Sequence, residues 1–154
     1  MTFTKGWELM EFKVADFTPE MAADLANIEC CCFSSPWSEN SIISSYEFNT
    51  TFFAAIVNKA IVGYGGVQSI SNEGYITNIA VLPKFRNNGI GKALFKRIVD
   101  FCTENCLSLL SLEVRQSNET AIHLYETFGL SAVGARKSFY TNPTEDAVIM
   151  TVNF

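Results

Sequence analysis

The clearest chemical signal in this sequence is a short loop with two glycines. The loop, Arg86-Asn87-Asn88-Gly89-Ile90-Gly91, follows an apolar run and precedes an amphipathic segment. Where a strand turns into a helix, several backbone N–H groups lack a helical partner and point out of one concave turn. Gly89 and Gly91 have no Cβ, so phosphate oxygens could approach the main chain here. The loop predicts an anion site, best suited to a diphosphate; the alternative is an ordinary glycine-containing corner.

Two other kinds of phosphate loop do not match this pattern. A Walker loop needs Ser or Thr after its Gly-Lys pair, whereas Gly91-Lys92 is followed by Ala93 and offers no hydroxyl for magnesium. A dinucleotide-binding loop has a third glycine and follows the first strand, whereas this loop follows the fourth predicted strand. We therefore expect neither a P-loop nucleotidase nor a dinucleotide-binding fold.

A second candidate is Glu113, in an otherwise apolar strand predicted over residues 109–114. Successive side chains of a strand point to opposite faces, so its apolar residues share one face and Glu113 lies with Ser111 on the other. Glu113 is near the carboxyl end of the strand, where open α/β sheets bind ligands. A carboxylate there could take a proton from a reacting amine, directly or through water. The alternatives are a solvated glutamate and a partner for Arg115.

The elements that must position these residues follow from hydrophobic periodicity and turn residues. Strands are expected at 8–15, 52–58, 61–70, 75–82, 109–114, 130–139 and 146–153, and helices at 19–31, 38–48, 90–102 and 118–128. Thr18 and Ser38 are expected as N-caps and Gly129 as a C-cap. The central strands predict an antiparallel meander, in which Gly63-Tyr64-Gly65-Gly66 forms a bulged, closely packed strand. We predict one α/β domain over residues 1–154, an α+β mixed sheet with helices on both faces.

Composition limits the class of protein. The chain has 154 residues and a net charge of −5, which disfavours a sequence-independent grip on nucleic-acid phosphates. No apolar run reaches the roughly 18 residues needed to span a bilayer, and the amino terminus does not resemble a signal peptide. We expect a cytoplasmic protein that contacts neither nucleic acid nor membrane.

The cysteines are Cys30, Cys31, Cys32, Cys102 and Cys106. Their odd number, the adjacent triplet and the lack of an export signal predict reduced thiols. Cys102 and Cys106 lie four residues apart in a predicted helix, but His123 is the only histidine and no Cys-x-x-Cys pair occurs. We therefore expect no metal site and predict that Cys102 and Cys106 are small buried hydrophobic residues.

The glycine loop and its flanks, from Asn78 to Leu94, resemble the signature of the GNAT acetyltransferase superfamily, Arg/Gln-x-x-Gly-x-Gly/Ala. In that superfamily the strand before the loop pairs with the pantetheine arm of CoA, and the predicted order of strands and helices agrees. Further segments similar to RimI-type members are 32–38, 112–118, 124–129 and 140–150. The resemblance implies the acyl-CoA N-acyltransferase fold, a mixed sheet of about seven strands flanked by about four helices. It also implies acetyl-CoA as co-substrate.

The resemblance further implies roles for single residues. Glu113 would be the general base and Tyr125 the general acid, whereas for Tyr125 the alternative is a core aromatic residue. The residues implied to contact acetyl-CoA are Ile79, Ala80, Val81, Arg86, Asn87, Asn88, Gly89, Ile90, Gly91, Lys92 and Asn118. Asn118 and Tyr125 are about two helical turns apart, so both can face one cleft. Trp37 and Tyr140 would flank the peptide entrance.

The acceptor implied by the RimI-type resemblance is a protein N-terminal amine, typically the alanine of a ribosomal protein, attacking acetyl-CoA directly in a ternary complex. We expect a monomer or a weak homodimer. The departures from the group are the triple cysteine, Leu130 where an aromatic residue is usual, and Phe139-Tyr140 in place of a Tyr-Tyr pair. Two other functions stay open: acetylation of a small amine, such as a polyamine or an antibiotic, and CoA binding without turnover.

Overall fold

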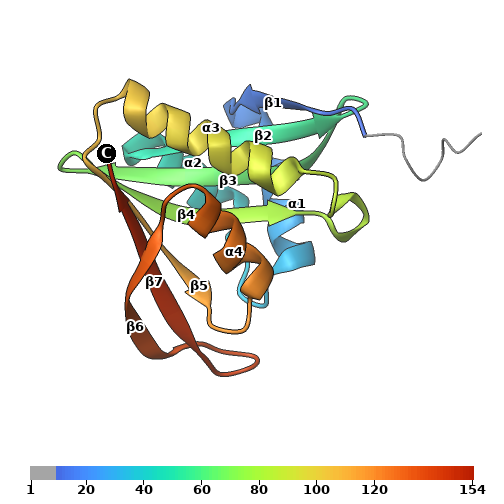
Figure 1. Cartoon of the computed structure of the whole chain (residues 1–154). Coiled ribbons are helices and arrows are strands. Elements are labelled where there is room, and N and C mark those ends of the chain that lie inside the picture. The colour runs from blue at the N-terminus through green and yellow to red at the C-terminus, as the bar shows by residue number, and fades with distance from the viewer. Residues whose placement is uncertain (1–9) are drawn as a thin grey trace, which may run out of the picture.

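The computed structural model describes residues 10–154, which form seven strands and four α-helices (Figure 1). In chain order the elements are β1 (Lys13–Asp16), α1 (Ala22–Cys32), α2 (Glu39–Phe48), β2 (Thr50–Val57), β3 (Ala60–Ile70), β4 (Glu73–Val81), α3 (Ile90–Glu104), β5 (Leu109–Arg115), α4 (Glu119–Thr127), β6 (Ser131–Tyr140) and β7 (Glu145–Asn153). Short 3-10 turns at Pro19–Met21 and Pro83–Phe85 precede α1 and α3. The predicted mixed sheet and the predicted order of its elements are confirmed.

All strands belong to one sheet, in the order β1-β2-β3-β4-β5-β7-β6. Neighbours are antiparallel except for β4 and β5, which run parallel. The predicted meander is confirmed for β2, β3 and β4. Asn58 and Lys59, with φ of 47° and 69°, make its first turn, because a two-residue hairpin turn of this kind needs positive φ at both positions.

The parallel contact between β4 and β5 is short, and this opens the sheet. Only residues 73–75 of β4 pair with residues 109–111 of β5, and beyond Tyr75 the two strands diverge (Figure 1). β4 is also bulged, since Gly66 of β3 lies opposite Asn78 and Val67 opposite Ile76, which leaves Thr77 unpaired. A Cβ on Gly66 would lie 2.6 Å from the Thr77 Oγ1 atom. The close packing predicted for the glycine strand is therefore confirmed, and this strand has its own bulge at Val62, since Ala55 lies opposite Gly63 and Ile56 opposite Ile61.

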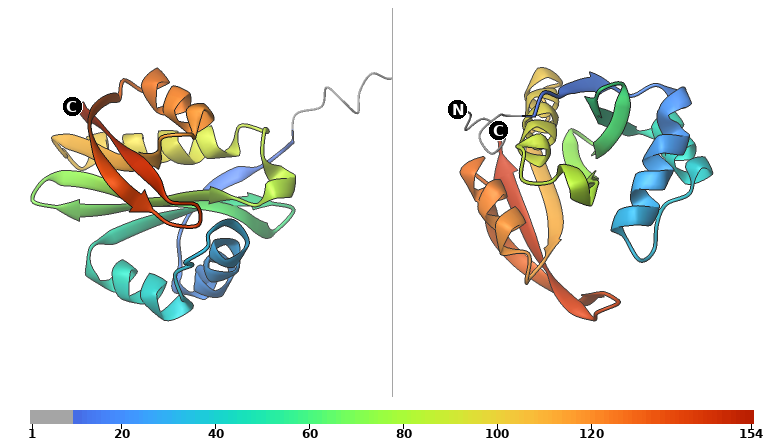
Figure 2. Two further views of the ribbon diagram at one scale, coloured as in Figure 1. Left: turned by 90° about the horizontal axis from the view of Figure 1, so that it is seen from below. Right: turned by 90° about the vertical axis from the view of Figure 1, so that its right-hand side faces the viewer.

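Helices cover both faces of the sheet, with α1 and α2 on one side and α3 and α4 on the other (Figure 2). The amphipathic α3 buries Leu94, Phe95 and Ile98 completely against the sheet. Each such side chain contributes about 1.5–3 kcal/mol through the apolar surface that it removes from water. A second cluster on the opposite face joins α1 and α2 to Phe52 and Tyr64.

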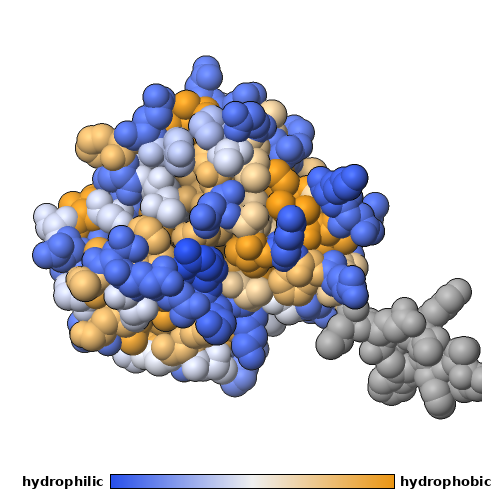
Figure 3. Space-filling model, turned by 90° about the horizontal axis from the view of Figure 1, so that it is seen from above, coloured by the Kyte–Doolittle hydropathy of each residue, from blue (hydrophilic) through white to orange (hydrophobic). Residues whose placement is uncertain are grey.

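The outer surface mixes hydrophilic and hydrophobic groups over the face seen in Figure 3. On the exposed side of α3, Lys96 and Asp100 form an ion pair of 2.8 Å one helical turn apart. Such exposed pairs contribute about 0.3–0.5 kcal/mol. No helix between residues 10 and 154 is both long and apolar enough to cross a bilayer.

The amino-terminal part differs from its prediction. The first strand was expected over residues 8–15; residues 8 and 9 lie outside the described part, and β1 covers only Lys13–Asp16. It pairs with residues 53–56 of β2, which itself extends from Thr50 to Val57. The following helix begins with a 3-10 turn, and Thr18 makes no side-chain cap. Ser38 does cap α2, accepting a hydrogen bond from the Ser41 amide.

The prediction for one of the two paired cysteines is wrong. Cys102 is fully buried in the core as expected, but Cys106 is exposed. α3 ends at Glu104, and Cys106 lies in the following turn with φ of 56°. The Leu107 amide donates back to the Cys102 carbonyl, which ends the helix before its periodicity reaches Cys106.

Candidate active site

The glycine loop turns backbone amides toward open space. Gly89 has φ of 81° and is the N-cap of α3, where no side chain caps the helix. The first α-helical bond runs from the Ala93 amide to the Gly89 carbonyl (3.0 Å), so the amides of residues 90–92 precede the helical ladder. A Cβ at Gly89 or Gly91 would have no neighbour within 4 Å. An anion can therefore approach these amides at the positive end of the α3 dipole.

Most side chains of the loop make contacts within the protein and do not point toward a ligand. Ile90 is buried in the core, so only its backbone can meet a ligand. The Asn88 side chain donates to the carbonyls of Phe85 and Arg86 (3.2 and 3.0 Å). Arg86 donates through Nε to the Val81 carbonyl (2.9 Å). Asn87 and Lys92 are exposed. Since the other side chains of the loop are buried or bonded to carbonyls, the main chain is the principal binding surface here.

β4 connects this loop to a pocket. Ile79, Ala80 and Val81 pair with β3 along one edge, while the edge turned to β5 has no strand partner beyond Tyr75. An extended ligand can add to such an edge as a further strand. The side chain of Ala80 is buried, so the main chain is again what this segment presents.

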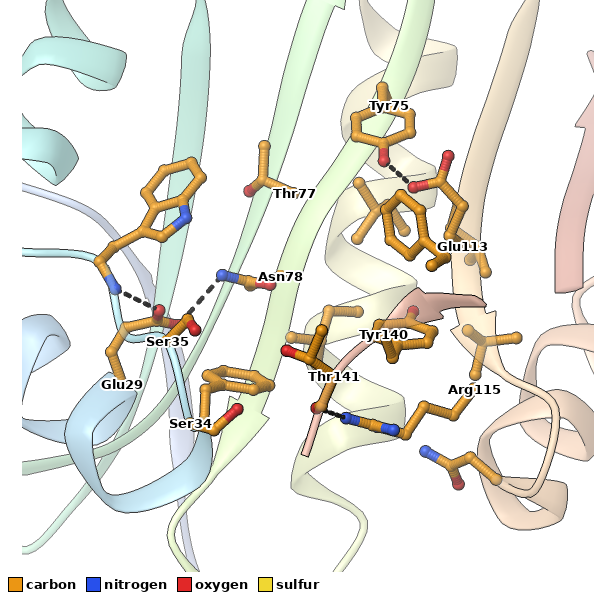
Figure 4. Close-up of a pocket in the computed structure, with 18 of the residues that line it drawn as sticks. Glu29, Ser34, Ser35, Tyr75, Thr77, Asn78, Glu113, Arg115, Tyr140 and Thr141 are labelled. Atoms are coloured by element: carbon orange, nitrogen blue, oxygen red, sulfur yellow. Dashed lines mark hydrogen bonds between the residues drawn. The ribbon is translucent and has the colours of Figure 1, made fainter. Parts of the chain in front are cut away.

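The pocket has a volume of about 660 Å³ and lies where β4 and β5 separate (Figure 4). Of the residues predicted from the sequence, Ile79, Glu113, Asn118 and Tyr125 line it. Ala80, Val81 and the loop from 86 to 92 do not, because they lie toward the far end of β4. The remaining walls come from α1, the segment 33–37, β6 and the turn after β6.

Glu113 holds a polar cluster at one side of the pocket. Its side chain is 7% exposed, and its Oε1 accepts a hydrogen bond from Arg136 Nε at 2.9 Å. The Tyr75 hydroxyl donates to the other carboxylate oxygen. Burial, followed by the neighbouring carboxylate, raises the pKa of Tyr75, so its phenol stays protonated as a donor. The alternative of a Glu113–Arg115 pair is wrong, since Arg136 of β6 takes that place.

Asn118 lies at the start of α4 and Tyr125 in its last turn. Both line the pocket, as their two-turn spacing predicts. Tyr125 packs its ring 4.9 Å from that of Phe95, and burial raises the pKa of Tyr125 to about 12. Asn118 is the N-cap of α4, because its Oδ1 accepts from the Ala121 amide at 3.1 Å. The hydroxyl and the amide thus reach the pocket from one rigid element.

A second carboxylate, Glu29 of α1, also lines the pocket and was missed by sequence reasoning. It is 1% exposed and accepts hydrogen bonds from the Trp37 amide (2.9 Å), Asn78 Nδ2 (3.1 Å) and the Tyr64 hydroxyl. The sequence feature that could have revealed Glu29 is its position one helical turn after Leu25, on the buried face of α1. A charged residue on an apolar stripe is rarely buried without partners.

The turn after β6 is held in place by Arg115. Its guanidinium donates to the carbonyls of Pro143 (2.9 Å) and Thr141 (3.0 Å) and lies 4.5 Å from the centre of the Tyr140 ring. Tyr140 and Trp37, expected beside a peptide entrance, both line the pocket. The partly exposed rings of Phe33 and Phe139 also line it.

The geometry combines an open edge of β4 with a pocket beside it. The sequence profile of the Acetyltransferase (GNAT) family matches residues 22–130. The chain belongs to the GNAT acetyltransferase family. Acetyl-CoA is the acetyl donor that this family implies, and the free amides and uncovered glycines of the loop fit its diphosphate. Within residues 10–154, no group of three or more His, Cys, Asp or Glu side chains could hold a metal ion.

Several GNAT proteins are similar to this chain over most of their length. A candidate ribosomal protein bS18-alanine N-acetyltransferase of Bacillus subtilis is 39% identical over 81% of this chain and 84% of its own. The ribosomal protein bS18-alanine N-acetyltransferase of Escherichia coli is 33% identical over 82% of this chain and 86% of its own. The crystal structure of the Escherichia coli ribosomal-protein-S18-alanine N-acetyltransferase superposes with a TM-score of 0.86 at 29% identity, covering 93% of this chain and 94% of that one.

Proposed function

We propose that this GNAT protein transfers the acetyl group of acetyl-CoA to a protein N-terminal amine, and that its acceptor is the N-terminal alanine of ribosomal protein bS18. The proposal is supported by relatives that carry this activity in their names and share 33–39% of their residues with this chain. It is also supported by a pocket whose walls extend from α1 to the turn after β6, which has room for the end of a peptide.

The observation that carries the proposal is the place of Glu113 relative to β4. A carboxylate with 7% of its side chain exposed lies in the pocket at the point where β4 and β5 part. An α-amine has an ordinary pKa of about 7.7–8.0, so much of it is protonated at neutral pH and must lose a proton before it attacks. Glu113 is the group proposed to take that proton, directly or through water.

The other residues are proposed to bind and orient. The amides of residues 90–92 and the open edge of β4 would hold the diphosphate and the pantetheine arm, and bound acetyl-CoA would supply the thioester carbonyl. Tyr75 and Arg136 hold the Glu113 carboxylate from both sides. Tyr125, which keeps its proton at neutral pH, is proposed to donate to the departing thiolate.

The test is acetyl transfer to a peptide that begins with the bS18 alanine. We expect release of CoA and one acetyl group on the α-amine, located by fragmentation in a mass spectrometer. The matched control is the same peptide with a blocked amino terminus and an internal lysine, which should stay unmodified. Acetylation of the lysine, or turnover only with small amines, would contradict the proposed acceptor.

A further inference from the structure

Two carboxylates face the pocket from opposite sides, and their electrostatic surroundings differ (Figure 4). Glu113 is paired with the guanidinium of Arg136, so that its charge is largely neutralised. Glu29 receives only neutral donors: a backbone amide, a side-chain amide and a phenol. Within residues 10–154, no Lys, Arg or His lies within ion-pair distance of Glu29.

The hydrogen-bond partners of Glu29 are all able to donate to a carboxylate. Oε1 accepts from the Trp37 amide, and Oε2 accepts from Asn78 and from the Tyr64 hydroxyl. Each partner is an N–H or O–H donor, and an ionised carboxylate can only accept. Burial raises the pKa of Tyr64, so the phenol keeps the proton that it donates. These contacts suit a buried carboxylate charge that has hydrogen-bond donors but no counter-ion in the wall of the pocket.

A buried charge without a counter-ion costs stability, because its hydration is lost and no cation replaces it. Such a charge becomes favourable only when a cation enters beside it. The acceptor proposed above arrives largely as an ammonium ion, and the wall that contains Glu29 faces the pocket that would receive it. In this low-dielectric setting the attraction is screened far less than at the surface.

We propose that Glu29 is a specificity-determining residue, whose buried charge makes the pocket select an acceptor that enters as a cation. Glu113 is then left for proton removal, and the two carboxylates divide binding and chemistry between them. This inference rests on the proposed function, since it concerns the same acceptor.

The experiment compares two peptides that differ only in their first group, the terminal amine or a hydroxyl in its place. Their dissociation constants from the CoA-bound protein are measured at pH 7 by calorimetry. We expect the wild-type protein to prefer the amine by about tenfold or more, and Glu29→Gln to lose this preference. Gln keeps the size of the side chain and can still accept from the Trp37 amide. Asp24→Asn, an exposed change of equal charge on the same helix, is the control that should keep the preference.

Two further measurements separate charge from structure. The melting temperature of Glu29→Gln should change little, because removal of the uncompensated buried charge offsets the loss of the acceptor for Asn78 and Tyr64. A lower melting temperature with equal weakening of both peptides would overturn the inference in favour of a structural role. Glu113→Gln should keep the preference for the amine, and its loss there would also overturn the inference. If the wild-type protein acetylates no peptide, the proposed function fails first; if it does and Glu29→Gln still prefers the amine, only this inference fails.

Discussion

The proposed donor end and the proposed acceptor end of the site are built from different parts of the polypeptide. At the donor end, the loop of residues 86–92 and the open edge of β4 present main-chain amides from one continuous segment. At the acceptor end, side chains converge from α1, β4, β5, α4 and the β6–β7 turn. Backbone amides bind a diphosphate whatever the neighbouring side chains are, whereas the pocket depends on each side chain that lines it. Changes at one end should therefore leave the other end largely intact.

The largest effect is expected from Glu113→Gln at the acceptor end. Loss of the proposed base should lower kcat about 10³-fold, while binding of acetyl-CoA stays unchanged. Steady-state kinetics with an alanine-initiated peptide and calorimetry with CoA measure the two quantities. Glu126→Gln, an exposed change on α4, is the matched control. Full turnover of Glu113→Gln across the pH range would show that Glu113 is not the general base.

Tyr125→Phe should lower kcat about 100-fold and leave both substrate affinities nearly unchanged. The ring contact with Phe95 is kept, so the free energy of unfolding should change by less than about 0.5 kcal/mol. Because burial raises the pKa of Tyr125 to about 12, the neutral phenol prevails at lower pH. The pH profile of wild-type kcat should then show no loss from Tyr125 below pH about 11. A descending limb near pH 10 that disappears in Tyr125→Phe would contradict this.

The glycines of the loop test the donor end alone. Gly91→Ala should raise the KM for acetyl-CoA about tenfold, because a methyl group would stand in the path of the phosphates. The same change should stabilise α3 by about 0.5–1 kcal/mol. Gly89→Ala should also weaken acetyl-CoA binding but should destabilise the protein, since φ is 81° there. Chemical denaturation measures the free energy of unfolding, which should rise for Gly91→Ala and fall for Gly89→Ala. A change in the KM of the peptide in either variant would show that the two ends are not independent.

The smallest effect is expected from Arg115→Gln, which frees the turn after β6. The KM for the peptide should rise about fivefold, in keeping with the loss of roughly one net hydrogen bond, and the KM for acetyl-CoA should not change. Lys137→Gln removes an exposed positive charge from the same hairpin and is the control. An equal rise in both KM values would show that the turn also supports the donor end.

Periodicity and local signals predicted most of the fold. These signals are local, so the sequence alone reveals them. They are the apolar residues every three or four positions along α3, the alternation in β5 and the caps at Ser38 and Gly129. Errors arose at the ends of elements, where hydrogen bonds rather than periodicity decide the boundary: β1 starts only at Lys13, and Cys106 lies beyond the end of α3. That residues 1–154 form one domain and that Glu113 and Tyr125 act as base and acid stay predictions.

What the sequence alone determined is the geometry of the glycine loop, the proposed donor end. Its determinants are contiguous: a strand, two glycines without a Cβ and a helix start, whose amides point outward by the geometry of the chain itself. Only the tertiary structure decided the acceptor end. Arg136 reaches Glu113 from a strand two positions away in the sheet, and Glu29 meets Tyr64 and Asn78 across 35 and 49 residues of chain. The energies of such contacts depend on distances that exist only after the sheet and its two cores have formed.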